Sequence, residues 1–206
     1  ETRYLNSNGF FTASGFYNVS KPIRNRKYVF NLGGTLTYNN NVSYLNSEKN
    51  IGRNWLFIQR VATDIRIKKW LETTIGGSYS LNSTHYSLQK ALNNDASTWT
   101  IQHSSRLFLP KNFRVNYDME KNFNTGFAST VNAAPFIINA SVEKSFGKKE
   151  QLALKLQGFD LLNENQNISR SVTASAITDS RVNRLRRYYL LTAIYRLNKF
   201  SGSGSG

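Results

Sequence analysis

Apolar and polar residues alternate along several long stretches of this chain. Between residues 28 and 38 the even positions carry aromatic residues, leucine or glycine, whereas most odd positions are polar. Residues 71–82, 98–109 and 113–120 repeat the alternation, with the apolar set on the odd positions. Successive side chains of a strand point to opposite faces, so each stretch predicts a strand with one apolar and one polar face. No stretch shows a helical period, and the chain is expected to be all-β.

Weaker forms of the pattern, over residues 11–19, 55–67, 136–146, 152–161 and 188–197, bring the total to about nine strands. Most of them are long for a soluble domain, where about 5–6 residues is usual. A tilted strand needs about 9–11 residues to cross a membrane. The strand lengths therefore favour a membrane barrel over a soluble sandwich.

The connections between these strands alternate in length. Short basic turns lie at residues 21–24, 68–69, 110–112 and 147–149, and longer polar loops span residues 39–54, 82–97, 120–133 and 163–187. Short periplasmic turns and long extracellular loops are typical of an outer-membrane barrel. Aromatic residues near strand ends, such as Tyr38, Trp55 and Trp99, match an interfacial girdle. The predicted fold is an antiparallel up-and-down transmembrane β-barrel.

Charge and composition limit the kinds of site and partner that the chain can have. The chain of 206 residues has a net charge of +15, two histidines and no cysteine, so disulfides and thiolate metal sites are excluded. Its basic residues fall in turns and loops rather than along one strand face, which favours contacts with anionic lipid headgroups over nucleic acid. We expect no nucleic acid partner and no cofactor.

The polar set of the strands is expected to face the lumen. Asp118 and Glu120 share one face at a spacing that suits paired carboxylates or a Ca²⁺ site, but the nearby Arg114 and Lys121 favour a ladder of salt bridges. The expected lumen-facing residues are Arg60, Asp64, Arg66, Glu72, Gln102, Arg106, Arg114, Asn116, Asp118 and Glu120.

An enzymatic alternative rests on one histidine. His103 lies beside Ser105, and Asp95 is in the preceding loop, so a Ser/His/Asp arrangement is an alternative to ordinary strand residues. Ordinary strand residues explain these side chains more simply, and the chain is not expected to be an enzyme.

The C-terminal stretch carries a specific resemblance. The run Phe159, Asp160, Leu161, Leu162 and Asn163 is followed by a strand whose pattern includes Tyr189, Leu191, Tyr195, Leu197 and Phe200. This combination resembles the C-terminal end of TonB-dependent-receptor-like outer-membrane β-barrel proteins, although Phe200 is out of phase with its apolar set. The resemblance implies that residues 1–200 are the C-terminal portion of a barrel of about twenty-two strands. The remaining N-terminal strands and a plug then lie outside this sequence.

The resemblance also implies a role and partners. The role is uptake of a nutrient across the bacterial outer membrane, and the partners are outer-membrane lipid, lipopolysaccharide, the missing strands and the plug. An odd strand number motivates an alternative, because single-chain bacterial barrels have even numbers. In that alternative the chain is a structural or assembly component, held by the outer-membrane insertion machinery or a lipoprotein partner. Residues 201–206 repeat Ser-Gly and are expected to be an engineered linker.

Overall fold

The computed structural model describes residues 8–128, 134–147, 150–173, 175–183 and 185–196. Nine strands form one antiparallel sheet in the order β1-β2-β3-β4-β5-β6-β7-β8-β11. These strands are β1 (Phe11–Ile23), β2 (Tyr28–Leu45), β3 (Glu48–Lys68), β4 (Leu71–Tyr86), β5 (Asn94–Leu109), β6 (Phe113–Thr125), β7 (Phe136–Phe146), β8 (Leu152–Phe159) and β11 (Tyr188–Tyr195). The all-β, nine-strand prediction is confirmed.

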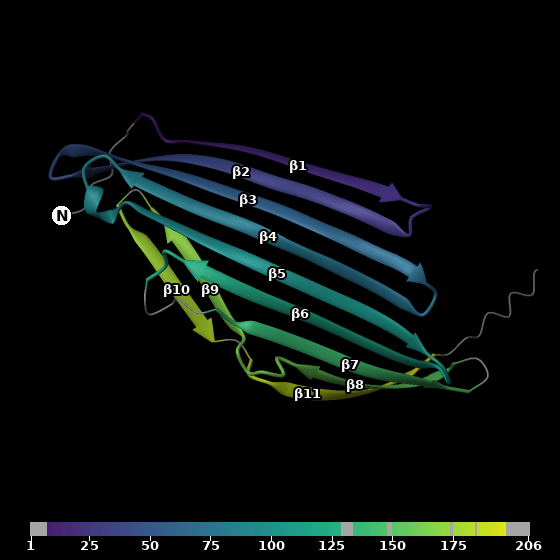
Figure 1. Cartoon of the computed structure of the whole chain (residues 1–206). Helices are drawn as coiled ribbons and strands as arrows, with labels where there is room; N and C mark the ends of the chain where they lie inside the picture. The colour runs from purple at the N-terminus through teal and green to yellow at the C-terminus, as the bar shows by residue number, and fades with distance from the viewer. Residues whose placement is uncertain (1–7, 129–133, 148–149, 174, 184, 197–206) are drawn as a thin grey trace, which may run out of the picture.

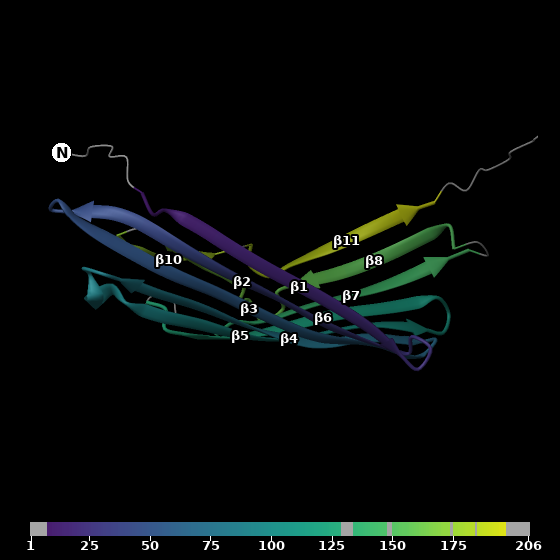
Figure 2. The same ribbon diagram turned by 90° about the horizontal axis from the view of Figure 1, so that it is seen from above.

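The sheet bends into an open trough. Figure 1 shows the strands running side by side and slanted, and Figure 2 shows β1 and β11 at the two rims with β4 and β5 at the floor. Each strand pairs with its neighbours in the chain, except that β8 pairs with β11 across the intervening hairpin of β9 (Gln166–Val172) and β10 (Ile177–Asn183). Over their described residues, the rims β1 and β11 do not pair with each other.

The two faces of the trough differ in chemistry. On β5 the convex face carries Trp99 and Ile101, which are 58% and 57% exposed, and the concave face carries the alternating polar set. The buried hydrophobic residues among those that the structure describes are only Tyr86, Ala96 and Ala153. A soluble sandwich buries its apolar face between two sheets, so this distribution excludes that alternative.

A glycine on the convex face makes room for an aromatic ring at the β1 rim. Tyr17 of β1 lies opposite Gly34 of β2, and a Cβ at Gly34 would lie 2.5 Å from the Tyr17 ring. The Tyr17 hydroxyl donates a hydrogen bond to Gln59 of β3, whose side-chain nitrogen donates to the Gly33 carbonyl at 3.0 Å. The ring therefore covers the bare backbone and satisfies a polar side chain on an apolar face.

The predicted long loops are wrong in three places, because the strands continue into them. β2 and β3 run on until only residues 46 and 47 connect them, and both have positive φ (50° and 69°), as a tight hairpin turn requires. β4 and β5 extend to Tyr86 and from Asn94, with a short 3₁₀ helix (Lys90–Leu92) between them, and β6 extends to Thr125. These extensions carry polar residues on both faces, so the alternation that marks a strand is lost there.

The fourth predicted loop, residues 163–187, contains the β9–β10 hairpin, which the sequence pattern did not reveal. The strand predicted to end at Leu161 ends at Phe159, where the chain turns. Leu197 and Phe200 of the predicted C-terminal pattern lie outside the described residues.

Candidate functional site

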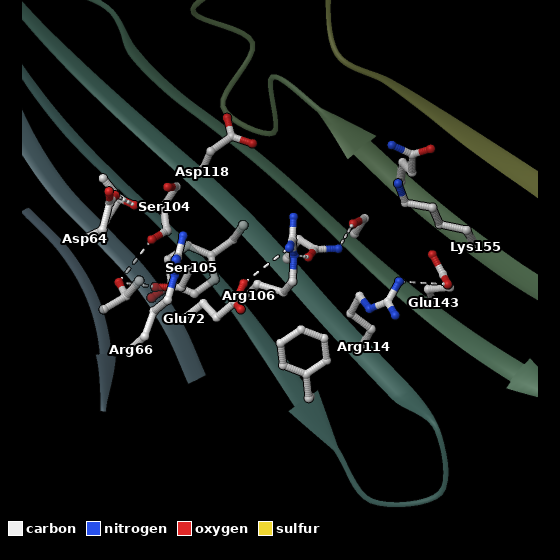
Figure 3. A pocket seen from close by; sticks show the side chains of 17 residues that line it. Asp64, Arg66, Glu72, Ser104, Ser105, Arg106, Arg114, Asp118, Glu143 and Lys155 are labelled. Atoms are coloured by element: carbon white, nitrogen blue, oxygen red, sulfur yellow. Dashed lines mark hydrogen bonds and ion pairs between the residues drawn. The ribbon is translucent and has the colours of Figure 1, made fainter. Parts of the chain in front are cut away.

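The concave face holds a polar hollow of about 750 Å³ between β3 and β8 (Figure 3). Seven of the residues expected to face the lumen line it: Asp64, Arg66, Glu72, Arg106, Arg114, Asn116 and Asp118. Glu143 of β7 and Lys155 of β8 line it too. These two were not among the predicted site residues, although the alternation over residues 136–146 places Glu143 in the polar set.

A chain of hydrogen bonds crosses four strands at the floor of the hollow. Arg106 of β5 pairs with Glu72 of β4 at 3.2 Å and donates from Nε to the Asn116 side chain of β6 at 3.2 Å. Asn116 donates in turn to Ser141 of β7 at 3.1 Å. Both partners of the ion pair are substantially exposed, so the pair adds little stability and its charges stay available to a solute.

A second ion pair lies one row nearer the short turns. Arg114 donates to Glu143 at 3.3 Å, and the Glu143 side chain is only 9% exposed. The Nε of Arg114 is buried and has no hydrogen-bond partner among the described residues. The predicted ladder of Asp118 and Glu120 with Arg114 and Lys121 is therefore wrong.

The register of the sheet explains that outcome. It places Asn139 opposite Asp118, to which it donates at 2.6 Å, and Gln102 opposite Glu120, to which it donates at 3.0 Å. Lys121 lies on the convex face. Both carboxylates therefore accept hydrogen bonds from neutral amides. Asp64 also has neutral partners, the Asn31 amide at 3.1 Å and the Thr74 hydroxyl at 2.7 Å.

Arg60 lies on the concave face outside the large hollow. The register pairs it with Gly33 and Ser78, and it lines a smaller hollow near the β1 rim. Gln102 and Glu120 line a further small hollow beside Asp118. The ten predicted residues thus share one face of the sheet, and seven of them meet in one hollow.

The Phe159–Asn163 run forms the corner after β8. Asp160 is 2% exposed, and its carboxylate accepts hydrogen bonds from the backbone N–H groups of Glu164 at 2.9 Å and Asn165 at 3.1 Å. The Asn163 side chain accepts the N–H of Arg187 at 3.2 Å, and Phe159 stacks on Tyr188 with ring centroids 4.6 Å apart. Leu161 is half-buried, Leu162 is exposed, and Tyr189, Leu191 and Tyr195 are exposed on the convex side of β11.

The corner leads into the β9–β10 hairpin, which folds over the concave face at the end of the trough away from the short turns. Arg170 and Asp179 form an ion pair at 2.7 Å, with side chains only 5% and 6% exposed. Arg170 also donates to the Asn94 side chain at 2.6 Å and to the Gly126 carbonyl at 2.9 Å. One buried arginine thus ties the hairpin to β5 and to the segment that follows β6.

Arg170 stabilises the ionised form of the Asp179 carboxyl. The Arg170 guanidinium, by hydrogen bonding Asp179, lowers the pKa of its carboxyl below the ordinary value, and the backbone N–H of Ala128 acts in the same direction. Burial opposes both effects. The carboxylate is consequently ionised at neutral pH, and the pair is intact there.

The enzymatic alternative gains no support from the geometry. His103 lies on the convex face, where its Nε2 is 3.2 Å from Ser105 Oγ and 3.0 Å from Thr73 Oγ1. Asp95 is opposite Ser83 and lies eight positions before His103 on β5, so it is about 25 Å from the histidine and completes no triad. Within the described ranges no three His, Asp or Glu side chains gather as a metal site would require.

No helix among the described residues is long and apolar enough to cross a membrane.

The antiparallel trough, with its apolar convex face and hydrogen-bonded polar concave face, has the chemistry of the wall of an outer-membrane β-barrel. The family comparison agrees. Residues 1–195 match the model of the Outer membrane protein beta-barrel family, and the chain belongs to that family.

Membership of this family places the protein in the bacterial outer membrane. Searches among curated proteins and among solved structures returned no match to the chain.

Proposed function

We propose that this chain forms the C-terminal strands of a larger barrel of TonB-dependent-receptor type, which takes up a nutrient across the outer membrane. The observation that carries the proposal is the hollow on the concave face, where charged and amide side chains from β3 to β8 point inward. Such a lining offers both hydrogen-bond donors and acceptors to a polar solute. We propose no catalytic role.

The open rims support the presence of further strands. Backbone groups of an unpaired strand cost several kcal/mol each in lipid, so a sheet in the outer membrane must close on itself. Within the part of the chain that the structure describes, β1 pairs only with β2, and β11 pairs only with β8. N-terminal strands that join these two rims, with a plug inside, complete the proposed barrel; insertion machinery or a lipoprotein partner are the other proposed contacts.

The proposed orientation follows from the connections. The turns between β1 and β2, β3 and β4, β5 and β6, and β7 and β8 are all short and lie at one end of the trough, whereas at the opposite end the β2–β3 turn is short but the other connections are longer. Short turns are periplasmic in bacterial barrels. The β9–β10 hairpin, at the opposite end, then covers the extracellular mouth.

Growth and uptake by cells test the proposal. The gene for the full-length protein is deleted, and growth is measured on a panel of single nutrients with and without a plasmid that restores the gene. We expect loss of at least one nutrient, restored by the wild-type protein. Glu72→Gln and Arg106→Gln should restore its uptake several-fold less well at equal surface abundance, because they remove charges that line the hollow.

Arg53→Gln is the matched control, since Arg53 lies exposed on the convex face. Unchanged growth on every nutrient after deletion, together with increased sensitivity of the envelope to detergent, would overturn uptake in favour of the structural role.

A further inference from the structure

A lysine lies on the lipid-facing side of the sheet near the short turns. Lys144 of β7 is opposite Phe113 of β6 and Leu154 of β8. It shares the convex face with Val142 and Phe146, whereas Glu143 points into the hollow on the other face. Its neighbours on this face are therefore aromatic and aliphatic. An ammonium group there loses hydrating water, and an anion nearby would compensate for that loss.

Two aromatic rings hold the ammonium group. Nζ of Lys144 lies 4.3 Å from the ring centroid of Phe113 and 5.4 Å from that of Phe146, within the range of cation–π attraction. The side chain is half-buried. Among the described residues it has neither a carboxylate partner nor a hydrogen-bond acceptor.

A second lysine on the same face provides the contrast. Lys121 of β6 also lies between two rings, with Nζ at 5.7 Å from Phe123 and 5.9 Å from Phe136, toward the other end of the trough. Its Nζ donates to the Ala134 carbonyl at 2.5 Å, so the ammonium group has a hydrogen-bond acceptor within the protein. The two sites differ in that Lys121 has an acceptor, whereas Lys144 has none among the described residues.

The depth of Lys144 indicates which anion is within reach. Phe113, its partner, is the first residue of β6, directly after the turn that contains Lys111. The Asn112 carbonyl of that turn accepts the N–H of Ser145, the residue after Lys144, at 3.1 Å. Lys144 thus lies at the boundary where strands end and lipid headgroups begin, with a second lysine in the adjacent turn.

We propose that Lys144, between Phe113 and Phe146, binds the phosphate of an anionic glycerophospholipid of the inner leaflet. The acyl chains of this lipid lie along the exposed Val142 and Leu156, which are opposite each other and further from the short turns than Lys144. The proposal uses the orientation given above, but it does not depend on uptake of a nutrient. An ammonium between two rings recognises a phosphate as a point charge, and the exposed aliphatic side chains beside it account for a lipid rather than a free phosphate.

Native mass spectrometry of the full-length protein in detergent tests this site. Phosphatidylglycerol is titrated against phosphatidylcholine and lipopolysaccharide. We expect the wild-type protein to prefer phosphatidylglycerol, and Lys144→Gln to weaken its apparent affinity about fivefold, the contribution of one lysine beside an anionic lipid surface. Lys144→Arg should retain most of the affinity, and Phe146→Leu should lose part of it while keeping an apolar side chain.

Lys121→Gln is the matched control, because it removes an equal charge from the same face. It is expected to leave phosphatidylglycerol affinity within twofold of wild type, since the Lys121 ammonium already has an acceptor. Equal affinity in Lys144→Gln and wild type, or equal losses in Lys144→Gln and Lys121→Gln, would overturn the site. A preference for lipopolysaccharide would overturn its assignment to the inner leaflet.

Discussion

The cost of a charge on this sheet depends on the face to which its side chain belongs. Ile101 lies on the convex face near the middle of β5, where lipid surrounds it. Ser104 is three residues further on and lines the hollow. The two positions therefore offer a matched comparison within one strand.

Ile101→Arg is expected to lower the free energy of unfolding by about 2–4 kcal/mol, because the guanidinium then meets lipid near the middle of the bilayer. Ser104→Arg should change it by no more than about 0.5 kcal/mol, because the hollow has room and Asp118 lies on the neighbouring strand. Urea unfolding of the full-length protein in lipid vesicles measures both. Similar losses for the two variants would show that the faces are not chemically distinct.

Single residues also show which parts of the hollow the sequence pattern predicts and which it does not. The alternation of Arg114, Asn116, Asp118 and Glu120 with apolar neighbours was sufficient to place these four on one face. It was not sufficient to find the partner of Arg114, because Glu143 is 29 residues further along the chain. Which residues of β6 and β7 stand opposite each other depends on register, and a period of two is the same in every second register.

Among the strands, the β9–β10 hairpin is the element that the alternation of apolar and polar residues does not predict. Its strands have seven residues each, and their polar residues show no clear two-residue alternation. The hairpin is held instead by two specific contacts with residues far away in the chain: Arg170 donates to Asn94 of β5, and Asp179 accepts from the backbone N–H of Ala128. The polar extensions of β2 and β3 were not predicted for a related reason, since both of their faces carry polar residues.

The hairpin contact is expected to depend on pH. The pKa of Asp179 is lower in the folded protein than in the unfolded chain, so its charge stabilises the docked hairpin above about pH 4, the ordinary carboxyl pKa. That stabilisation is lost as pH falls through the lowered pKa. A spin label on Ser175→Cys, in the connection between β9 and β10, should therefore be immobile at pH 7 and gain mobility in acid.

Arg170→Met provides the control for the hairpin. It leaves Asp179 without its cation, and the label should be mobile already at pH 7. A label that stays immobile in acid and in Arg170→Met would show that other contacts, such as the hydrogen bond from Tyr86 to the Thr173 carbonyl at 2.9 Å, dock the hairpin.

The molecule as a whole is built on one curved sheet whose two faces differ in chemistry (Figure 2). Charged and amide groups meet across strands on the concave side, and the large exposed apolar side chains lie mostly on the convex side. Strand count and facing could be predicted because they repeat along the chain. Closure could not, because it depends on how the rims β1 and β11 meet further strands.

Site-directed spin labelling along β5 distinguishes the lipid-facing side of the sheet from the water-facing side. Single cysteines are introduced at each position from Trp99 to Leu109 in the full-length protein in lipid vesicles, and the access of dissolved oxygen and of a water-soluble nickel chelate to each label is compared. We expect oxygen to reach the odd positions and the chelate the even ones, with a period of two along the strand. Equal access of the chelate to both sets would contradict a sheet with one face toward lipid.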